Sequence, residues 1–129
     1  MPKIKVSTGE LIDKITILQI KEDYIDDDVK LKHIRKELEV LNSVLSEEKI
    51  DVPKELVDEL MDINRQLWDV EDVIRACEKD KDFSEGFIEC ARLDAILNDK
   101  RFLAKNKINN HTESSIKEQK SYEGLYTTD

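Results

Sequence analysis

The feature that most constrains this chain is a row of apolar residues between about 53 and 78, spaced alternately three and four positions apart. That spacing brings side chains to one face of an α-helix. A shorter row with the same alternation predicts another helix over about 28–46. Such rows are typical of helical hairpins and coiled coils, in which helices bury their apolar faces against each other. The two rows are Leu56, Leu60, Ile63, Leu67, Val70, Ile74 and Cys77, and Leu31, Ile34, Leu38, Leu41 and Leu45.

The segment 8–25 is apolar on two opposite sides of its predicted helix. A helix of this kind is buried on two sides. It is therefore either the central helix of a bundle or part of a subunit interface, and we expect a homo-oligomer, most simply a dimer. One side consists of Leu11, Ile15, Leu18 and Ile25, and the other, the candidate interface, of Ile17, Ile20 and Tyr24.

A fourth helix is predicted over about 83–109, again from apolar residues at helical spacing. Its expected buried face also carries Asn98, and a buried amide needs a hydrogen-bond partner. The apolar members of that face are Phe87, Ile88, Ala91, Ala95 and Phe102, widened by Leu93, Ile96, Leu97 and Ile108.

Few residues interrupt these helices, because the 129-residue chain has only 3 Gly and 2 Pro. Ser7 with Glu10 forms a capping box before the first helix, and Asn109-Asn110 is a plausible stop for the last. We expect one all-α domain over residues 1–110, a four-helix bundle. Residues 111–129 are expected to be a polar tail, partly disordered or forming a short helix that packs back.

The net charge of −9 disfavours binding to nucleic acid, although Lys100, Arg101, Lys105 and Lys107 form a local basic strip. No apolar run approaches the roughly 20 residues of a membrane span, so we expect a cytoplasmic protein with no membrane partner. The two cysteines, Cys77 and Cys90, fit reduced thiols that pack as small hydrophobic groups.

The chain offers no strong catalytic or metal-binding pattern, and we do not expect an enzyme or a cofactor. Di-metal bundles need Glu-x-x-His pairs, which His33 and His111 do not provide. Arginines that clamp a dicarboxylate are a further possibility, but Arg75 follows Glu71 by four positions, as in surface ion pairs. Acidic pairs suited to Mg²⁺ do occur, but so acidic a helical chain produces them on solvated faces as well; they are Glu55, Asp58, Glu59 and Asp62, and Glu85 and Glu89.

Asn98 leads to one alternative hypothesis, because a polar residue on a buried face either sets helix register or lines a pocket. In the second case the protein binds or acts on a nucleotide or an anionic metabolite, with Mg²⁺ as a candidate cofactor. The ligand-binding candidates are Trp68, Asp69, Asp72, Asn98, Asp99 and Arg101.

Four blocks of sequence occur in an order that resembles a family of small uncharacterised helical proteins of bacteria and phages. The blocks are residues 6–15, residues 67–75, residues 98–101 with Lys105 and 108–109, and residues 118–122. The resemblance implies a single helical domain and assigns no activity. The chain departs from the family pattern at Phe102 and Asn106.

Together these observations favour a non-catalytic helical interaction or assembly module. The small ligand-binding protein or enzyme remains the alternative.

Overall fold

The computed structural model describes residues 1–112, which form four α-helices without a strand among them. The helices are α1 (Thr8–Tyr24), α2 (Asp28–Glu47), α3 (Lys54–Asp80) and α4 (Glu85–His111). The predicted all-α fold class with four packed helices is thus confirmed, and each helix begins and ends close to its expected bounds. The predicted polar tail lies outside the described residues, apart from its first two positions.

Side chains of the kind expected cap the first two helices. The Ser7 hydroxyl accepts a hydrogen bond from the backbone N–H of Glu10 at 3.1 Å. The Asp27 carboxylate accepts from the backbone N–H groups of Val29 and Lys30 at 2.9 and 3.0 Å. Such caps satisfy N–H groups that have no partner within the helix.

The last helix extends slightly past the predicted stop at Asn109-Asn110, because α4 continues to His111. Asn109 is fully buried, and its side-chain oxygen accepts a hydrogen bond from α1. It therefore packs inside the protein as a helical residue and does not adopt a left-handed cap.

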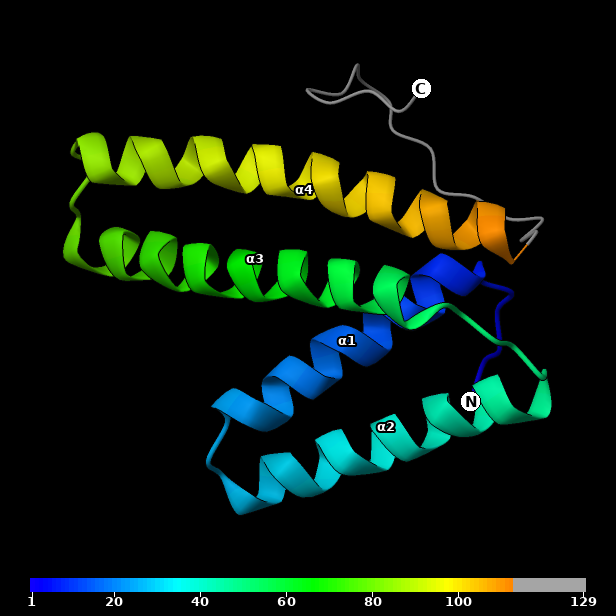
Figure 1. The fold of residues 1–129 in the computed structure, drawn as a ribbon. Coiled ribbons are helices and arrows are strands. Elements are labelled where there is room, and N and C mark those ends of the chain that lie inside the picture. The colour runs from blue at the N-terminus through cyan, green and yellow to red at the C-terminus, as the bar shows by residue number, and fades with distance from the viewer. Residues whose placement is uncertain (113–129) are drawn as a thin grey trace.

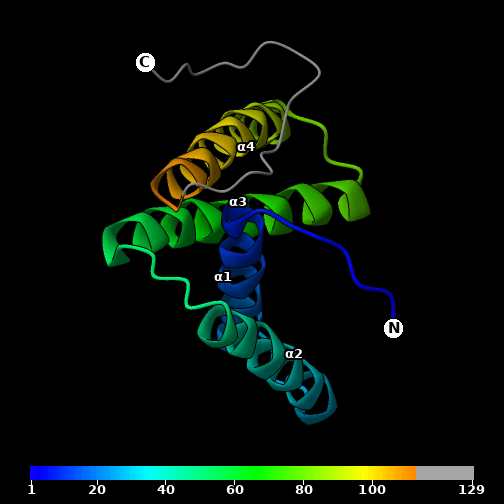
Figure 2. The same ribbon diagram turned by 90° about the vertical axis from the view of Figure 1, so that its right-hand side faces the viewer.

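The four helices form two hairpins joined through α1 (Figures 1 and 2). Helices α3 and α4 lie antiparallel along their length, and α1 and α2 form the second hairpin. Helix α1 packs against α2 on one side and against α3 and α4 on the other. Within the described residues, α2 packs only against α1, so it forms an outer layer.

The position of α1 explains its two apolar sides. Leu11, Ile15 and Leu18 pack with α2, whereas Ile12 packs into the core of α3 and α4. Burying a Leu or Ile side chain contributes about 1.5–3 kcal/mol, so each side adds materially to stability. On the second predicted side, Ile20 is also buried within the chain, whereas Tyr24 is 47% exposed.

The buried face of α4 differs from the predicted one by a rotation of one residue. Cys90, Leu97, Ala104 and Ile108 pack towards α3, whereas Ile88, Ala91 and Ala95 are exposed. The packed row also includes Asp94 and Arg101 by its spacing, which makes it less apolar in sequence than the neighbouring row. The prediction therefore selected the wrong row.

Only the first half of α3 and the last half of α4 lie beside α1. The contacts of α1 reach Trp68 and Asp69 on α3 and Arg101 on α4. Beyond them, residues 70–97 form a projecting antiparallel pair that we call the arm (Figure 1). Within the described part of the chain, no helix is long and apolar enough to cross a membrane.

Candidate functional site

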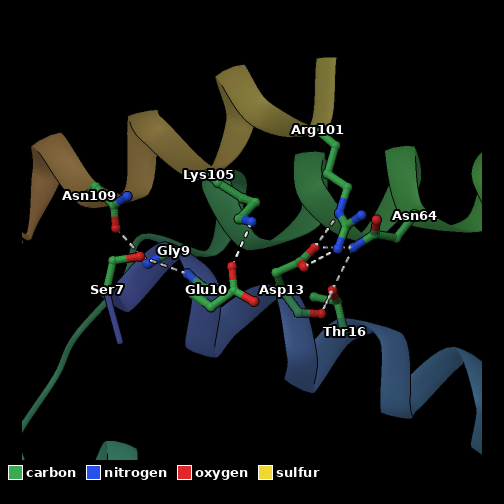
Figure 3. Close-up of polar contacts among 9 residues, drawn as sticks. All are labelled: Ser7, Gly9, Glu10, Asp13, Thr16, Asn64, Arg101, Lys105 and Asn109. Atoms are coloured by element: carbon green, nitrogen blue, oxygen red, sulfur yellow. Dashed lines mark hydrogen bonds and ion pairs between the residues drawn. The ribbon is translucent and has the colours of Figure 1, made fainter. Parts of the chain in front are cut away.

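Polar side chains from three helices meet where α1 crosses α3 and α4 (Figure 3). We call this cluster the polar joint. Its members come from positions far apart in the chain, so tertiary packing alone brings them together. They are Glu10, Asp13 and Thr16 of α1, Asn64 of α3, and Arg101, Lys105 and Asn109 of α4.

Asp13 is the centre of the joint, with only 1% of its surface exposed. Its carboxylate accepts hydrogen bonds from the Arg101 guanidinium, through Nε at 2.9 Å and through Nη2, and from the Asn64 amide at 2.9 Å. Burial acts to raise the pKa of Asp13, but the hydrogen bonds from Arg101 and Asn64 and the nearby cations outweigh it and lower that pKa. Asp13 is therefore an ionised partner of Arg101.

A second ion pair and a close backbone contact complete the joint. The buried Lys105 ammonium donates to Glu10 at 2.7 Å. The backbone N–H of Gly9 donates to the Asn109 side-chain oxygen at 2.7 Å. A Cβ at Gly9 would lie 2.5 Å from the backbone oxygen of Lys105, so only glycine allows α1 to approach α4 this closely.

The polar joint was not predicted from the sequence. Asp13 and Arg101 are separated by 88 positions, and no local pattern links them. One signal was present: Asn64 falls in the same helical row as Met61 and Trp68, which marks it as facing another helix. Because the charged groups of the polar joint pair with one another, the joint holds the helices together.

The six predicted ligand-binding residues have different contacts. Trp68 stacks near Tyr24 with ring centroids 5.6 Å apart, and Asp69 accepts from the Tyr24 hydroxyl at 3.4 Å. Asn98 donates to the backbone oxygen of Asp94 at 3.0 Å. Asp72 is exposed, Asp99 is buried, and Arg101 belongs to the polar joint.

The predicted interface residues on α1 also lie in different surroundings. Ile20 is only 1% exposed and is buried inside the chain, and Ile17 is half-buried. Tyr24 is exposed over 47% of its surface while its ring lies against Trp68. These positions leave little apolar surface of α1 for a second copy.

The basic strip on α4 is used within the chain. Arg101 and Lys105 pair with residues of α1, and Lys107 donates to Glu59 of α3 at 2.9 Å. The strip is therefore not a continuous patch for phosphate groups. In residues 1–112, no group of three or more acidic, His or Cys side chains is placed to hold a metal ion.

One face of the α3/α4 hairpin lies on the same side as α1. On α4 this side is one row with three- and four-residue spacing. At one end of the row Lys105 and Asn109 contact α1, and at the other end the residues are exposed. We call the exposed end, Ile88, Ala91 and Ala95, the open row.

The matching row of α3 changes in the same way along its length. Asn64 and Trp68 contact α1, whereas Glu71 and Arg75, further along the row, are exposed. Helix α1 thus covers only half of this face. The other half lies on the arm and consists of the open row of α4 and the charged continuation of the row on α3.

Two carboxylates lie near this uncovered half of the face. Partial burial raises the pKa of Glu71, and the negative charge of Asp94 raises it further. One oxygen of Asp94 is buried and has no hydrogen-bond partner among residues 1–112. The arm as a whole carries eight acidic and four basic residues, so it is negatively charged.

The outer face of α2 has the opposite charge. Residues 30–36 contain four Lys or Arg and one His without an acidic residue. An open groove of about 730 Å³ follows this helix and includes Lys32, His33, Arg35 and Lys36, which we call the basic face; Asp28 and Glu39 line its ends. Val29 and Val40 are exposed on the same side, away from α1.

Fold and site together define a class of small, all-helical proteins in which two hairpins are fastened by buried ion pairs. The chain belongs to the family of unknown function DUF6165, whose model matches residues 2–129. No curated protein and no solved structure matches the chain. The expected membership in an uncharacterised helical family is thereby confirmed at the level of the family.

Proposed function

We propose that this protein is a non-catalytic helical interaction module that assembles with a second copy through its arm. The observation that carries this proposal is the open row on α4. Its spacing is that of a buried helical face, and its continuation at Lys105 and Asn109 is in fact buried against α1. Half of one continuous face is therefore filled and half is not.

The energetics favour burial of the open half. Ile88 has 53% of its surface exposed, and Phe83 near the tip of the arm has 49%. Removing apolar surface from water contributes about 25 cal/mol per Å². Ala91 and Ala95 have small side chains, which allow a second helix to approach α4 closely.

A second copy suits the arm in charge. The arm is acidic, and the same chain carries the basic face of α2. Two copies therefore present complementary surfaces to each other, and electrostatic complementarity favours the correct partner over others. The polar joint supports a non-catalytic role, since its charged groups act on one another.

Sedimentation velocity over a range from low to high micromolar protein tests the proposal. We expect the wild type to form dimers as concentration rises, and Ile88→Asp to remain monomeric with unchanged helical content. Leu93→Asp is the matched control, because Leu93 is an exposed apolar residue of the same helix outside the open row. A monomeric wild type throughout, or a loss of dimers in Leu93→Asp but not in Ile88→Asp, contradicts the proposal.

A further inference from the structure

In the half of the hairpin covered by α1, a buried carboxylate is paired with a cation. On the arm, two carboxylates lie near each other. In the polar joint, Arg101 of α4 donates to the buried Asp13 of α1. Seven positions earlier on α4, and thus two helical turns away, Asp94 lies near Glu71. The negative charge of Asp94 disfavours ionisation of Glu71.

Arg101 and Arg75 act on Glu71 from a distance and lower its pKa, but burial and Asp94 prevail. A cationic side chain brought beside the exposed Glu71 would offset the repulsion from Asp94. The uncovered face therefore suits a helix with positive charges and small apolar groups.

The outer face of α2 has this composition. Lys32 and Lys36 are one turn apart and point away from α1, because the buried residues Ile34 and Leu38 occupy the opposite side of the helix. Neither lysine forms an ion pair with another residue in the described part of the chain. Val29 and Val40 lie at the two ends of this face, 68% and 49% exposed.

We infer that the basic face of α2 in a second copy covers the open half of this α3/α4 face, with Lys32 and Lys36 beside Glu71 and Asp94. Val29 and Val40 then cover apolar surface of the open row. Each copy carries both surfaces, so a two-fold pairing uses both contacts and closes a dimer. This inference rests on the proposed self-assembly and names the surface that receives the arm.

Charge-reversal variants test the pairing. One variant carries Lys32→Glu and Lys36→Glu on α2, and the other carries Glu71→Lys and Glu78→Lys on the arm; all four positions are exposed. We expect each variant alone to dimerise at least about tenfold more weakly than the wild type, and an equimolar mixture of the two to recover association. Dimerisation of the wild type should also weaken as salt is raised.

The control variant carries Lys3→Glu and Lys5→Glu, which change the net charge equally at exposed positions before α1. It should dimerise as the wild type does. If Ile88→Asp abolishes dimers while the α2 reversal leaves them unchanged, the arm binds a different surface, so this inference fails and the proposed function stands. If the wild type is monomeric, both fail; if the mixture does not recover association, the pairing of these two surfaces is wrong.

Discussion

The two halves of the α3/α4 hairpin place polar and apolar side chains in opposite ways. Where α1 covers the hairpin, charged residues are buried. Lys105 of α4 is 3% exposed, and Asp13 of α1 is 1% exposed. On the arm, large apolar residues are exposed instead, as Ile88 and Phe83 are. Helix α3 and helix α4 run through both halves, so the difference arises from what covers them.

This difference separates two kinds of requirement on one pair of helices. Buried ion pairs fix where α1 crosses the hairpin, since a displaced α1 would leave Asp13 without Arg101. Exposed apolar residues contribute little to the fold of a single chain and gain stability only when a partner covers them. The covered half thus determines the fold, and the arm is available for association.

Removing Arg101 should have the largest effect on stability. In Arg101→Met, Asp13 keeps its bond from Asn64 but stays buried without its cationic hydrogen-bond partner. We expect a loss of about 3 kcal/mol in the free energy of unfolding, measured by urea denaturation. Arg75→Met, on the exposed arm, serves as the control and should change stability by less than about 0.5 kcal/mol. Equal losses of stability in Arg101→Met and Arg75→Met would contradict the difference between the covered half of the hairpin and the arm.

Substitution of two glycines tests the same contrast through the backbone. Gly9→Ala places a Cβ 2.5 Å from the Lys105 backbone oxygen and should cost about 2 kcal/mol, although alanine favours helix. Gly86→Ala on the arm meets no atom within 4 Å and should stabilise the protein by up to about 1 kcal/mol. Thermal unfolding of both variants would show opposite signs. A stabilising Gly9→Ala would mean that α1 is not held so close to α4.

The dependence of stability on pH should report the Asp13–Arg101 pair. Because folding lowers the pKa of Asp13, its ionised form stabilises the protein above the unfolded-state pKa, and this stabilisation is lost as pH falls through the folded-state pKa. Asp13→Asn should therefore be about 1–2 kcal/mol less stable than the wild type at neutral pH, with the difference narrowing in acid. A constant difference from neutral to acidic pH would show that the charge of Asp13 does not matter.

The smallest expected effect concerns Glu71 on the arm. Since folding raises its pKa, the ionised side chain slightly destabilises the isolated chain at neutral pH. Glu71→Gln should thus raise the melting temperature of the monomer at neutral pH. The expected gain in the free energy of unfolding is less than about 0.5 kcal/mol, and it should vanish at a pH where the wild-type side chain is protonated. The exposed Glu37→Gln is the control. A lower melting temperature for Glu71→Gln would mean that its neighbours already compensate its charge.

The sequence predicted helices and their approximate ends well, because these follow from local spacing and caps. It also predicted that α1 is buried on two sides, since Leu11, Ile15 and Leu18 recur at helical intervals. The packed face of α4 was predicted wrongly, because Asp94 and Arg101 interrupt the row that faces α3. A prediction from local spacing assigns charged residues such as these to the solvent-exposed face of a helix.

The polar joint could not be predicted for a related reason. The bonds between Asp13 and Arg101 form across 88 positions, and a charged residue on a helix is most often exposed. Only tertiary structure shows which ion pairs become buried. That the open row is exposed could not be predicted either, since the same spacing describes a face covered within the chain and a face covered by a partner.

Hydrogen exchange of the backbone amides at low and high protein concentration tests the central claim most directly. If a second copy covers the arm, exchange in residues 84–97 and 28–40 should slow as concentration rises, while the amides of α1 exchange unchanged. Slower exchange confined to α1, or none in the arm of a protein that dimerises, would contradict the account.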